Sequence, residues 1–349
     1  MTAFRGFQPL INKLTRQEDL TTEEAAAAMA EIMEGRAAAA HIAGLLIGLA
    51  MKGERPAEIV GFARAMRARA VQLSRRYEDV FDTCGTGGDR SGTFNISSCA
   101  AVVVAACGVR VAKHGNRSAS SQTGGADVYE ALGMRIDASP AVVERCLAEI
   151  GIGFFFAPTF HPSMKHAGPV RRELGVRSAF NLLGPLTNPA GAARQVVGVS
   201  SPELTELLAR ALLLLGTTRA WVVHGADGID ELTTAGYTKV SECRDGTVNT
   251  FYLHPTDVGL PKSPTGALAG GDARTNAAII EAILAGERGA ARDVVLLNAG
   301  AGLFVAGCAD SVQDGIARAA RAIDSGDAKR TLQRLVATTA EEVVAGGGA

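Results

Sequence analysis

The sequence predicts an α/β protein with a small all-helical N-terminal domain and a large α/β domain, whose central, mostly parallel sheet is flanked by helices. Residues 1–72 carry apolar residues at helical spacing without any strand or hairpin pattern. After Arg76, short apolar runs alternate with helical stretches, which is typical of a parallel sheet covered on both faces. We therefore expect domains at 1–72, completed by helices from about 162–190, and at 77–345.

Within the N-terminal region, three helical segments stand out. Thr21 and Glu24 fit a capping box at the start of the first, and Gly35 ends it. The second covers about residues 37–51. Pro56 begins the third, because proline is favoured in the first turn of a helix.

The large domain is predicted from a repeating order of strands and helices. The expected parallel strands are 78–84, 109–115, 152–158, 194–200 and 219–225, and the helices between them are 95–107, 139–151 and 201–216. Residues 238–255 contain two strand-like runs around Asp245-Gly246 and predict an antiparallel hairpin. Three or four helices from Asp272 onward complete the chain.

Composition excludes several classes of function. The chain has 35 Lys and Arg against 36 Asp and Glu, and this balance argues against an electrostatic grip on nucleic acid or a membrane surface. Aromatic residues make up only 5%, so platforms for stacking bases are scarce. Six cysteines form no C-x-x-C pair, and the N-terminus lacks the apolar core of a signal peptide. We expect a cytoplasmic protein that binds small molecules and neither nucleic acid nor membrane.

Residues 85–98, GTGGDRSGTFNISS, join a glycine-rich turn to the start of a helix, directly after a predicted strand. Backbone N–H groups and the helix dipole bind anions at such a place. A dinucleotide fingerprint would need glycine where Arg90 stands, and a Walker A loop would need a lysine that is absent. The pattern predicts another kind of anion loop, with Asp89 placed for a ribose hydroxyl or a metal-bound water. A turn built for packing alone is the alternative.

Three polar residues follow this turn at the start of the helix: Asn95, Ser97 and Ser98. Each of them alone is best explained as a cap for free helix N–H groups. Together, after a glycine loop, they favour a cradle for an oxyanion.

A second polar loop, residues 112–127 (AKHGNRSASSQTGGAD), ends the next predicted strand. Lys113, His114, Asn116 and Arg117 concentrate hydrogen-bond donors there. Because ligands bind outside the carboxyl ends of parallel strands, this loop and the glycine loop are expected to face one crevice. A solvated surface loop is the alternative.

Residues 161–175 contain His161 and His166, whose spacing of five does not place them on one helix face and makes a poor metal pair. Arg171 and Arg172 follow. One of them is suited to form a fork with a carboxylate, although adjacent arginines more often face solvent.

Asp230 and Glu231 follow the strand predicted at 219–225. Magnesium prefers oxygen ligands and commonly bridges one or two carboxylates to a substrate phosphate. The pair is therefore a candidate divalent-metal site, with an acidic surface pair as the alternative.

In this order, the motifs GTGGD…TFNIS, KHGNR, FFFAPTFHPSMK, RRELGVRSAFNLLGPLTNP and GIDELTTAG resemble the anthranilate phosphoribosyltransferases, over about residues 5–340. The resemblance implies the fold group of the pyrimidine nucleoside phosphorylases and a homodimer associating through the small domains. It also implies transfer of the 5-phosphoribosyl group from 5-phosphoribosyl diphosphate (PRPP) to the amine of anthranilate, releasing pyrophosphate, in tryptophan biosynthesis. Two Mg²⁺ ions per subunit are expected.

The resemblance also assigns site residues. Those expected to contact PRPP are Gly85, Gly88, Asp89, Thr93, Asn95, Ile96, Ser97, Ser98, Lys113, His114, Gly115, Asn116, Arg117, Ser118, Ala119, Ser120, Ser121 and Gly125. Those expected to contact anthranilate are Gly85, Asn116 and Arg171, with Arg171 meeting the carboxylate. The expected magnesium ligands are Ser97, Asp230 and Glu231. No catalytic acid or base is assigned; His114 is the nearest candidate, although positioning is favoured over proton abstraction.

Three positions depart from the family pattern. Gly125 stands where serine is usual, and Ser98 and Ser178 stand where threonine is usual. Two other functions are considered: a nucleoside phosphorylase, and a non-catalytic relative that binds nucleic acid or regulates. The acidic pair at 230–231 argues against both, because neither needs a metal that binds a diphosphate.

Overall fold

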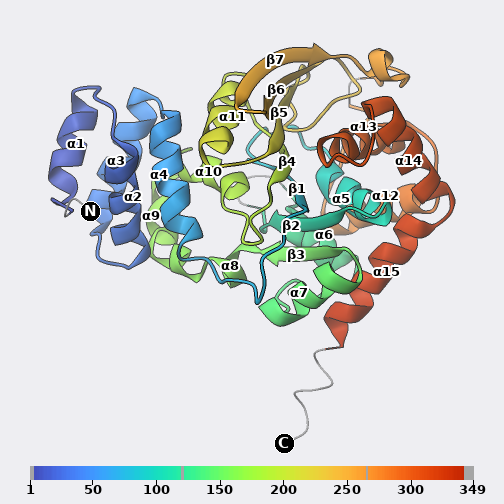
Figure 1. Cartoon of the computed structure of the whole chain (residues 1–349), viewed down its shortest axis with the longest axis horizontal. Helices are drawn as coiled ribbons and strands as arrows, with labels where there is room; N and C mark the ends of the chain where they lie inside the picture. Colours follow the sequence, from blue (N-terminus) through green and yellow to red (C-terminus); the bar gives the residue numbers. More distant parts are fainter. Residues whose placement is uncertain (1–3, 119–121, 265, 342–349) are drawn as a thin grey trace, which may run out of the picture.

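A computed structural model of the chain describes residues 4–118, 122–264 and 266–341. At its centre lies one seven-stranded sheet (Figure 1). The strands lie in the order β3 (Ile152–Phe156), β2 (Arg110–Gly115), β1 (Val80–Gly85), β4 (Arg194–Gly198), β5 (Arg219–Gly225), β6 (Thr238–Arg244) and β7 (Thr247–Leu253). β1 to β5 are parallel, and β6 and β7 are antiparallel to their neighbours. The predicted fold class is confirmed.

The antiparallel hairpin of β6 and β7 turns at Asp245 and Gly246, as the sequence predicts. Both residues have positive φ, 50° and 78°. A two-residue turn with this geometry matches the right-handed twist of the strands on either side.

β1 lies between β2 and β4, so the order of strands reverses there. The helix after β1, α5 (Ile96–Ala106), lies on one face of the sheet. The helix after β4, α11 (Leu204–Leu214), lies on the other. In parallel sheets, this reversal opens a crevice outside the carboxyl ends of the strands.

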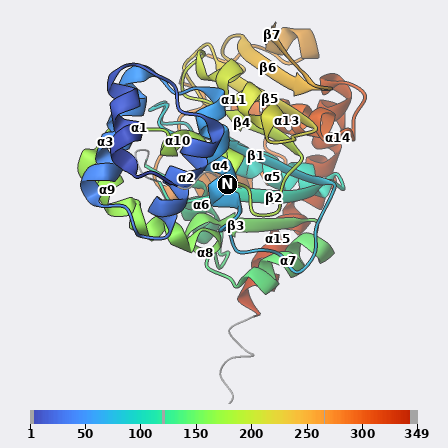
Figure 2. The ribbon, with the colours of Figure 1, turned by 60° about the vertical axis from the view of Figure 1, so that its left-hand side comes forward.

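Four helices form the N-terminal bundle, which lies at one side of the sheet (Figure 2). They are α1 (Phe7–Thr15), α2 (Thr22–Met33), α3 (Ala39–Lys52) and α4 (Pro56–Arg67). α1 precedes the three helices that the sequence singled out. The capping box at α2 is confirmed: Glu24 N donates to Thr21 Oγ1 at 3.1 Å, and Thr21 N donates to Glu24 Oε2 at 2.9 Å.

The bundle shares its apolar core with a later stretch of chain. This stretch contains η1 (Pro162–His166), α9 (Gly168–Leu174), α10 (Phe180–Leu183) and η2 (Gly184–Leu186), and it follows α8 (Ala157–Phe160), whose Phe160 is buried in the cluster on the opposite face of the sheet. Val170, Phe180 and Leu186 are buried in the core shared with the bundle. The Arg67 Nε donates to the Leu186 carbonyl at 2.6 Å.

The same apolar core continues under the sheet. Along β5, Ala220 and Val222 face the cluster that includes the bundle and α11, whereas Trp221 and Val223 face the cluster on the opposite side. The bundle is thus joined to one face of the sheet through α11, and the predicted domain limits at 72, 77 and 345 stay a prediction.

The opposite face carries the remaining helices of the large domain. Besides α5 they are α6 (Gly125–Ala131), α7 (Pro140–Glu149), α12 (Ala273–Leu284), α13 (Ala290–Val305), α14 (Val312–Asp324) and α15 (Asp327–Ala340), with the short turn η3 (Pro255–Val258) beside β7. α13 packs closely on α5 and the sheet: a side chain at Gly302 would meet the Phe81 ring at 3.0 Å. Within the described ranges, we find no helix with the length and apolarity needed to cross a bilayer.

Candidate active site

The loop between β1 and α5 depends on glycine for its backbone conformation. Gly87, Gly88 and Gly92 have φ of 66°, 78° and 68°. Glycine adopts this left-handed region without a steric penalty because it has no side chain, whereas other residues do not. Arg90 also adopts it, with φ of 58°. The loop therefore has a fixed and unusual path close to the ends of the strands.

Two further glycines make room for Asp230. A side chain on Gly85 would collide with the Asp230 carboxylate, and one on Gly198 would collide with the Asp230 backbone carbonyl. Gly87 N donates to Asp230 Oδ2 at 2.8 Å. These glycines thus bring the acidic pair against the glycine loop.

Three carboxylates meet at this point. Asp230 N donates to Asp89 Oδ2 at 3.3 Å, and Ser97 N donates to Glu231 Oε1 at 3.0 Å at the start of α5. Burial raises the pKa of Asp230, and the nearby Asp89 carboxylate raises it further. Burial, followed by the charge of Asp230, raises the pKa of Glu231. Like charges held together in this way are stabilised by a nearby cation, although no group of three or more acidic, histidine or cysteine side chains among the described residues is arranged to hold a metal ion by itself.

The donor set fits a hard divalent cation. Asp230 and Glu231 offer carboxylate oxygens and Ser97 offers a hydroxyl, which are ligands that Mg²⁺ accepts. Lys113 supplies one nearby positive charge: its ammonium donates to the Thr83 carbonyl at 2.6 Å and to Ser97 Oγ at 3.4 Å. The positive charge of Lys113 lowers the pKa of Glu231, but burial outweighs it and leaves that pKa raised.

A buried aspartate that the sequence analysis missed organises the strand ends. Asp82 on β1 is fully buried, and its carboxylate accepts from His114 N at 3.2 Å and from Asn188 Nδ2 at 2.7 Å. Asn188 Nδ2 also donates to the Ala112 carbonyl at 2.8 Å. Asp82 thereby joins β1, the end of β2 and the segment after α10. A lone charged residue within an apolar strand was the available signal.

His114 and His161 lie together below the crevice. Both are buried, and their ring centroids are 5.2 Å apart. Burial lowers the pKa of His114 to about 3 and that of His161 to about 4. The two rings are therefore neutral at pH 7. Each Nε2 has no hydrogen-bond partner among the described residues.

The second polar loop is held by acidic residues of α6. Arg117 Nη1 donates to Asp127 Oδ1 at 2.9 Å, and its guanidinium also donates to both oxygens of Glu130. Asp127 Oδ2 accepts from Ser118 N and Gly124 N at 3.0 and 2.9 Å. Asn116 is exposed, and Gly115 ends β2. The predicted residues Ala119, Ser120 and Ser121 lie outside the described residues.

The two adjacent arginines of α9 differ in their surroundings. Arg171 is partly buried, with its guanidinium 5.0 Å from the centre of the Phe180 ring, whereas Arg172 is exposed. Burial lowers the pKa of Arg171, which still leaves it charged. No hydrogen bond or ion pair joins the Arg171 guanidinium to another described residue, so it remains available for a ligand.

The capping alternative weighed for Asn95 does not hold, and its place in an oxyanion cradle stays a prediction. Asn95 is the N-cap residue, but its side chain accepts no hydrogen bond from the helix. Its amide is instead engaged by other loops, because Nδ2 donates to the Thr123 carbonyl at 3.1 Å and Oδ1 accepts from Asn276 at 3.0 Å. Tertiary contacts therefore take the place of the local cap.

The other predicted residues of this region have distinct surroundings. The Ile96 side chain is buried in the core, so only its backbone faces the loop. Thr93 forms an isolated bridge with Ala269. A side chain at Gly125 would lie 3.3 Å from Ser98 Oγ. Two of the three departures from the family pattern thus face each other.

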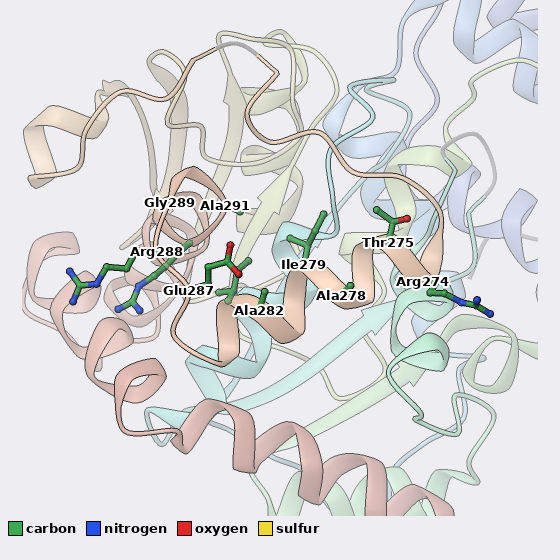
Figure 3. Close-up of a pocket in the computed structure, with 11 residues that line it drawn as sticks. Arg274, Thr275, Ala278, Ile279, Ala282, Glu287, Arg288, Gly289 and Ala291 are labelled. Atoms are coloured by element: carbon green, nitrogen blue, oxygen red, sulfur yellow. The ribbon is translucent and has the colours of Figure 1, made fainter.

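A cavity of about 630 Å³ lies on α12 and the start of α13 (Figure 3). Its polar lining residues include Arg274, Glu287 and Arg288, and Arg292 there is paired with Asp324 at 2.7 Å. None of its lining residues is among those predicted from the sequence, so the cavity is separate from the candidate active site.

Two family models match the chain. One, described as "Glycosyl transferase family, helical bundle domain", matches residues 8–70, and "Glycosyl transferase family, a/b domain" matches residues 77–329. An anthranilate phosphoribosyltransferase of Moorella thermoacetica is 54% identical over 94% of this chain and 96% of that protein. An anthranilate phosphoribosyltransferase of Symbiobacterium thermophilum is 53% identical over 93% of this chain and 96% of that protein.

The chain belongs to the anthranilate phosphoribosyltransferase family.

Solved structures of anthranilate phosphoribosyltransferases agree with this assignment. The crystal structure from Thermus thermophilus superposes with a TM-score of 0.88 at 46% identity, covering 94% of this chain and 98% of that one. The Saccharomyces cerevisiae structure in complex with PRPP and Mg superposes with a TM-score of 0.87 at 25% identity, covering 96% and 98%. The resemblance stated from the sequence motifs is confirmed. The roles of single residues stay predictions.

Proposed function

We propose that this chain transfers the 5-phosphoribosyl group from PRPP to the amine of anthranilate, releasing pyrophosphate in tryptophan biosynthesis. The observation that carries the proposal is the meeting of three carboxylates, Asp89, Asp230 and Glu231, with the glycine loop and the N-terminus of α5. The substrates are inferred from family membership, because the names of the relatives include anthranilate and one relative was solved in complex with PRPP.

PRPP is proposed to bind along the glycine loop and the loop that follows β2. The left-handed glycines leave backbone N–H groups close to the ligand, and Lys113 adds a fixed positive charge beside Ser97. The loop after β2 closes over the ribose and the 5-phosphate in this proposal.

Magnesium is proposed to be held by Ser97, Asp230 and Glu231, with two ions per subunit. When bound, it neutralises charge on the diphosphate leaving group, which can contribute several kcal/mol to stabilising a transition state. The yeast relative was solved with PRPP and Mg, which supports the assignment. The donor set and the crowded carboxylates of this chain support it independently.

A direct test replaces Asp230 by Asn. The variant keeps the shape of the side chain but loses the charge, so turnover is expected to fall and to need more magnesium. The measurement is the initial rate across a magnesium titration, with Asp245→Asn, an exposed turn residue, as control. An unchanged magnesium dependence would remove Asp230 from the proposed site.

Anthranilate is proposed to be held by Arg171, which meets its carboxylate, with Asn116 and the backbone of Gly85 beside it. Cleavage of the ribose–diphosphate bond gives an oxocarbenium-like ribose, and the bound amine is then held in line to attack its C1. The aromatic amine carries a free lone pair and needs no strong base. The low pKa of the buried His114 leaves it neutral, which is compatible with a positioning role.

A homodimer and a cytoplasmic location are further proposals. Met51 and Val176, in and beside the helical bundle, are large apolar residues that are 77% and 51% exposed. A partner that covers them would remove apolar surface from water. Sedimentation velocity measures this state directly, and a monomer at micromolar concentration would exclude the proposed dimer.

The experiment that tests the function follows the loss of anthranilate fluorescence on mixing the protein with PRPP and magnesium. The decrease is expected only when both are present, and EDTA or the omission of PRPP is expected to abolish it. If a folded protein gives no decrease, nucleosides with inorganic phosphate are the next substrates, because they test the phosphorylase alternative.

A further inference from the structure

Asn276, in the first turn of α12, lies beneath the loops assigned to PRPP although the sequence analysis did not single it out. It is 1% exposed. Its Nδ2 donates to Asn95 Oδ1 at 3.0 Å, and its Oδ1 accepts from Gly271 N at 2.8 Å. Both ends of one buried amide are therefore used to join separate segments of chain.

The bond to Asn95 extends to the second polar loop. Asn95 Nδ2 donates to the Thr123 carbonyl at 3.1 Å, and Thr123 Oγ1 donates to the Gly271 carbonyl at 2.9 Å. The hydrogen bonds thus form a closed circuit through Asn276, Asn95, Thr123 and Gly271. We call these four residues the amide circuit.

Backbone pairing beside the amide circuit fixes the glycine loop as well. Gly270 N donates to the Gly92 carbonyl at 2.8 Å, and Phe94 N donates to the Leu268 carbonyl at 3.2 Å. A side chain on Gly270 would meet the backbone of Phe94 at 2.6 Å. The segment before α12 is consequently hydrogen-bonded along the glycine loop and holds it in place.

We propose that Asn276 is a positioning residue for PRPP, which sets the start of α5 against Thr123, next to the start of α6, through Asn95. The inference rests on the proposed function and names a residue that does not itself touch the substrate. A buried side-chain amide whose N–H and C=O groups are both hydrogen-bonded holds its partners in one arrangement. Breaking either bond leaves a buried polar group unpaired, and this costs more free energy than the hydrogen bond itself contributes to stability. The consequence is that Asn276 acts on the diphosphate and ribose half of the site, with little effect on the anthranilate half.

The geometry separates this role from a general contribution to stability. Among the described residues, no hydrogen bond joins the Asn276 side chain to the acidic pair or to Arg171. One of its two bonds leads directly to Asn95, and the other leads to Gly271, whose carbonyl accepts from Thr123. A purely structural residue would lower the melting temperature and the amount of active enzyme without changing the Michaelis constants. A positioning residue changes the constant for one substrate.

The experiment compares Asn276→Ala and Asn276→Asp with the unaltered chain. The Asp variant keeps an acceptor for Gly271 N but has no donor for Asn95, so it tests that bond even if the Ala variant folds poorly. We expect the KM for PRPP to rise about tenfold, as for the loss of one buried polar contact, and the KM for anthranilate to change by less than about twofold. Thr331→Val on α15, far along the chain, is the folding control and is expected to change neither constant.

A double-mutant cycle tests whether Asn276 acts through Asn95. If it does, Asn95→Ala combined with Asn276→Ala is expected to bind PRPP no more weakly than the worse single variant. Calorimetric titration of PRPP with magnesium, without anthranilate, measures this binding independently of turnover. Fully additive losses, or an unchanged PRPP constant in a folded Asn276→Asp variant, would overturn the proposal.

The same experiments keep this inference apart from the proposed function. If the unaltered chain neither binds PRPP nor consumes anthranilate, the proposed function fails, and the inference fails with it. If the unaltered chain is active and the Asn276 variants match it in both constants, only the inference fails.

Discussion

At the scale of single residues, neighbouring side chains of the same type have different chemical roles. Arg171 lies half-buried beside Phe180 with no hydrogen-bond or ion-pair partner among the described residues, while Arg172 is directed to solvent. A desolvated guanidinium binds a carboxylate more strongly than an exposed one does. The pair is thus a built-in comparison for the proposed anthranilate contact.

Replacing Arg171 by Ala is expected to raise the KM for anthranilate about tenfold to a hundredfold, since a hydrogen bond to a charged group contributes roughly 1.5–3 kcal/mol. The KM for PRPP is expected to stay nearly unchanged. Steady-state kinetics with each substrate varied in turn measures both constants, and Arg172→Ala is the matched control. Equal changes in both constants would exclude Arg171 as the carboxylate contact.

The buried histidines predict how stability depends on pH. The pKa is about 3 for His114 and about 4 for His161 in the folded chain, below the ordinary value near 6.5 of an unfolded histidine. As the pH decreases, His114 and His161 therefore bind protons in the unfolded chain while they stay neutral in the folded chain. Stability is intact above pH 6.5 and falls as the pH decreases toward 4, by on the order of 2 kcal/mol per histidine at pH 5.

Guanidinium unfolding between pH 7.5 and 5 measures this loss. His114→Gln is expected to show a smaller decrease in the free energy of unfolding than the unaltered chain, whatever its stability at pH 7.5. His254→Gln replaces an exposed histidine and is expected to keep the full decrease. Identical slopes for His114→Gln and the unaltered chain would contradict the buried, neutral state of His114.

The sequence predicted residues with a visible local pattern better than residues that act through tertiary contacts. The glycine loop was predictable because backbone positions with positive φ require glycines, which are visible in the sequence. The acidic pair was predictable because two adjacent carboxylates follow a predicted strand. Asp82 and Asn276 were missed, since one polar residue within a strand or at the start of a helix gives no indication of its distant partners. The bonds of Asn95 to Thr123 and Asn276 were missed for the same reason.

At the scale of elements, the C-terminal helices position the loops of the sheet. Asn298 on α13 is buried, accepts from Leu232 N at 3.1 Å and donates to the Leu232 carbonyl at 2.9 Å. Leu232 directly follows the acidic pair. α13 therefore fixes the backbone that presents Asp230 and Glu231, from the face of the sheet opposite the helical bundle.

Asn298→Ala is expected to raise the magnesium concentration for half-maximal rate severalfold, because losing buried hydrogen bonds worth about 1 kcal/mol each loosens this backbone. The increase in melting temperature on adding magnesium and PRPP is expected to shrink in parallel. Asn249→Ala on the exposed edge strand β7 is the control. A normal magnesium response in a folded Asn298→Ala variant would show that α13 does not set the metal site.

The elements themselves were predictable where periodicity or turn chemistry is strong. The five parallel strands and the Asp245-Gly246 hairpin lie within a few residues of their expected positions. α1 was not separated from the rest of the helical region, because it lacks a capping signal: its N-cap residue, Gly6, has no side chain to accept a hydrogen bond from the helix. The pairing of β4 with β1 is a long-range choice that local pattern does not encode.

At the scale of the whole molecule, the helical bundle and the sheet share one apolar cluster. Leu208 and Leu212 of α11 are fully buried between α4 and the sheet. The side chain of Arg64 reaches the same helix, donating to the Leu214 carbonyl at 3.3 Å. The bundle is therefore not expected to unfold independently of the sheet.

Leu212→Ala is expected to lower the free energy of unfolding by about 2–5 kcal/mol, as for other buried leucines. Amide hydrogen exchange is expected to speed up in α4 as well as in α11. Leu303→Ala, an equally buried change in the cluster on the opposite face, is expected to leave α4 protected. Faster exchange confined to α11 in the Leu212→Ala variant would mean that the bundle is an independent unit.

The contact of Asp230 with two glycines constrains how this sequence can diverge. While Asp230 keeps its place, Gly85 and Gly198 exclude every substitution, alanine included, because even one methyl group collides with it. A lineage that abandons the metal by losing the Asp230 carboxylate would free Gly85, whereas Gly198 would still meet the backbone carbonyl at position 230. Gly85 and Asp230 are thus expected to change together during evolution, and a homologue that carries alanine at position 85 is expected to have lost magnesium-dependent transfer.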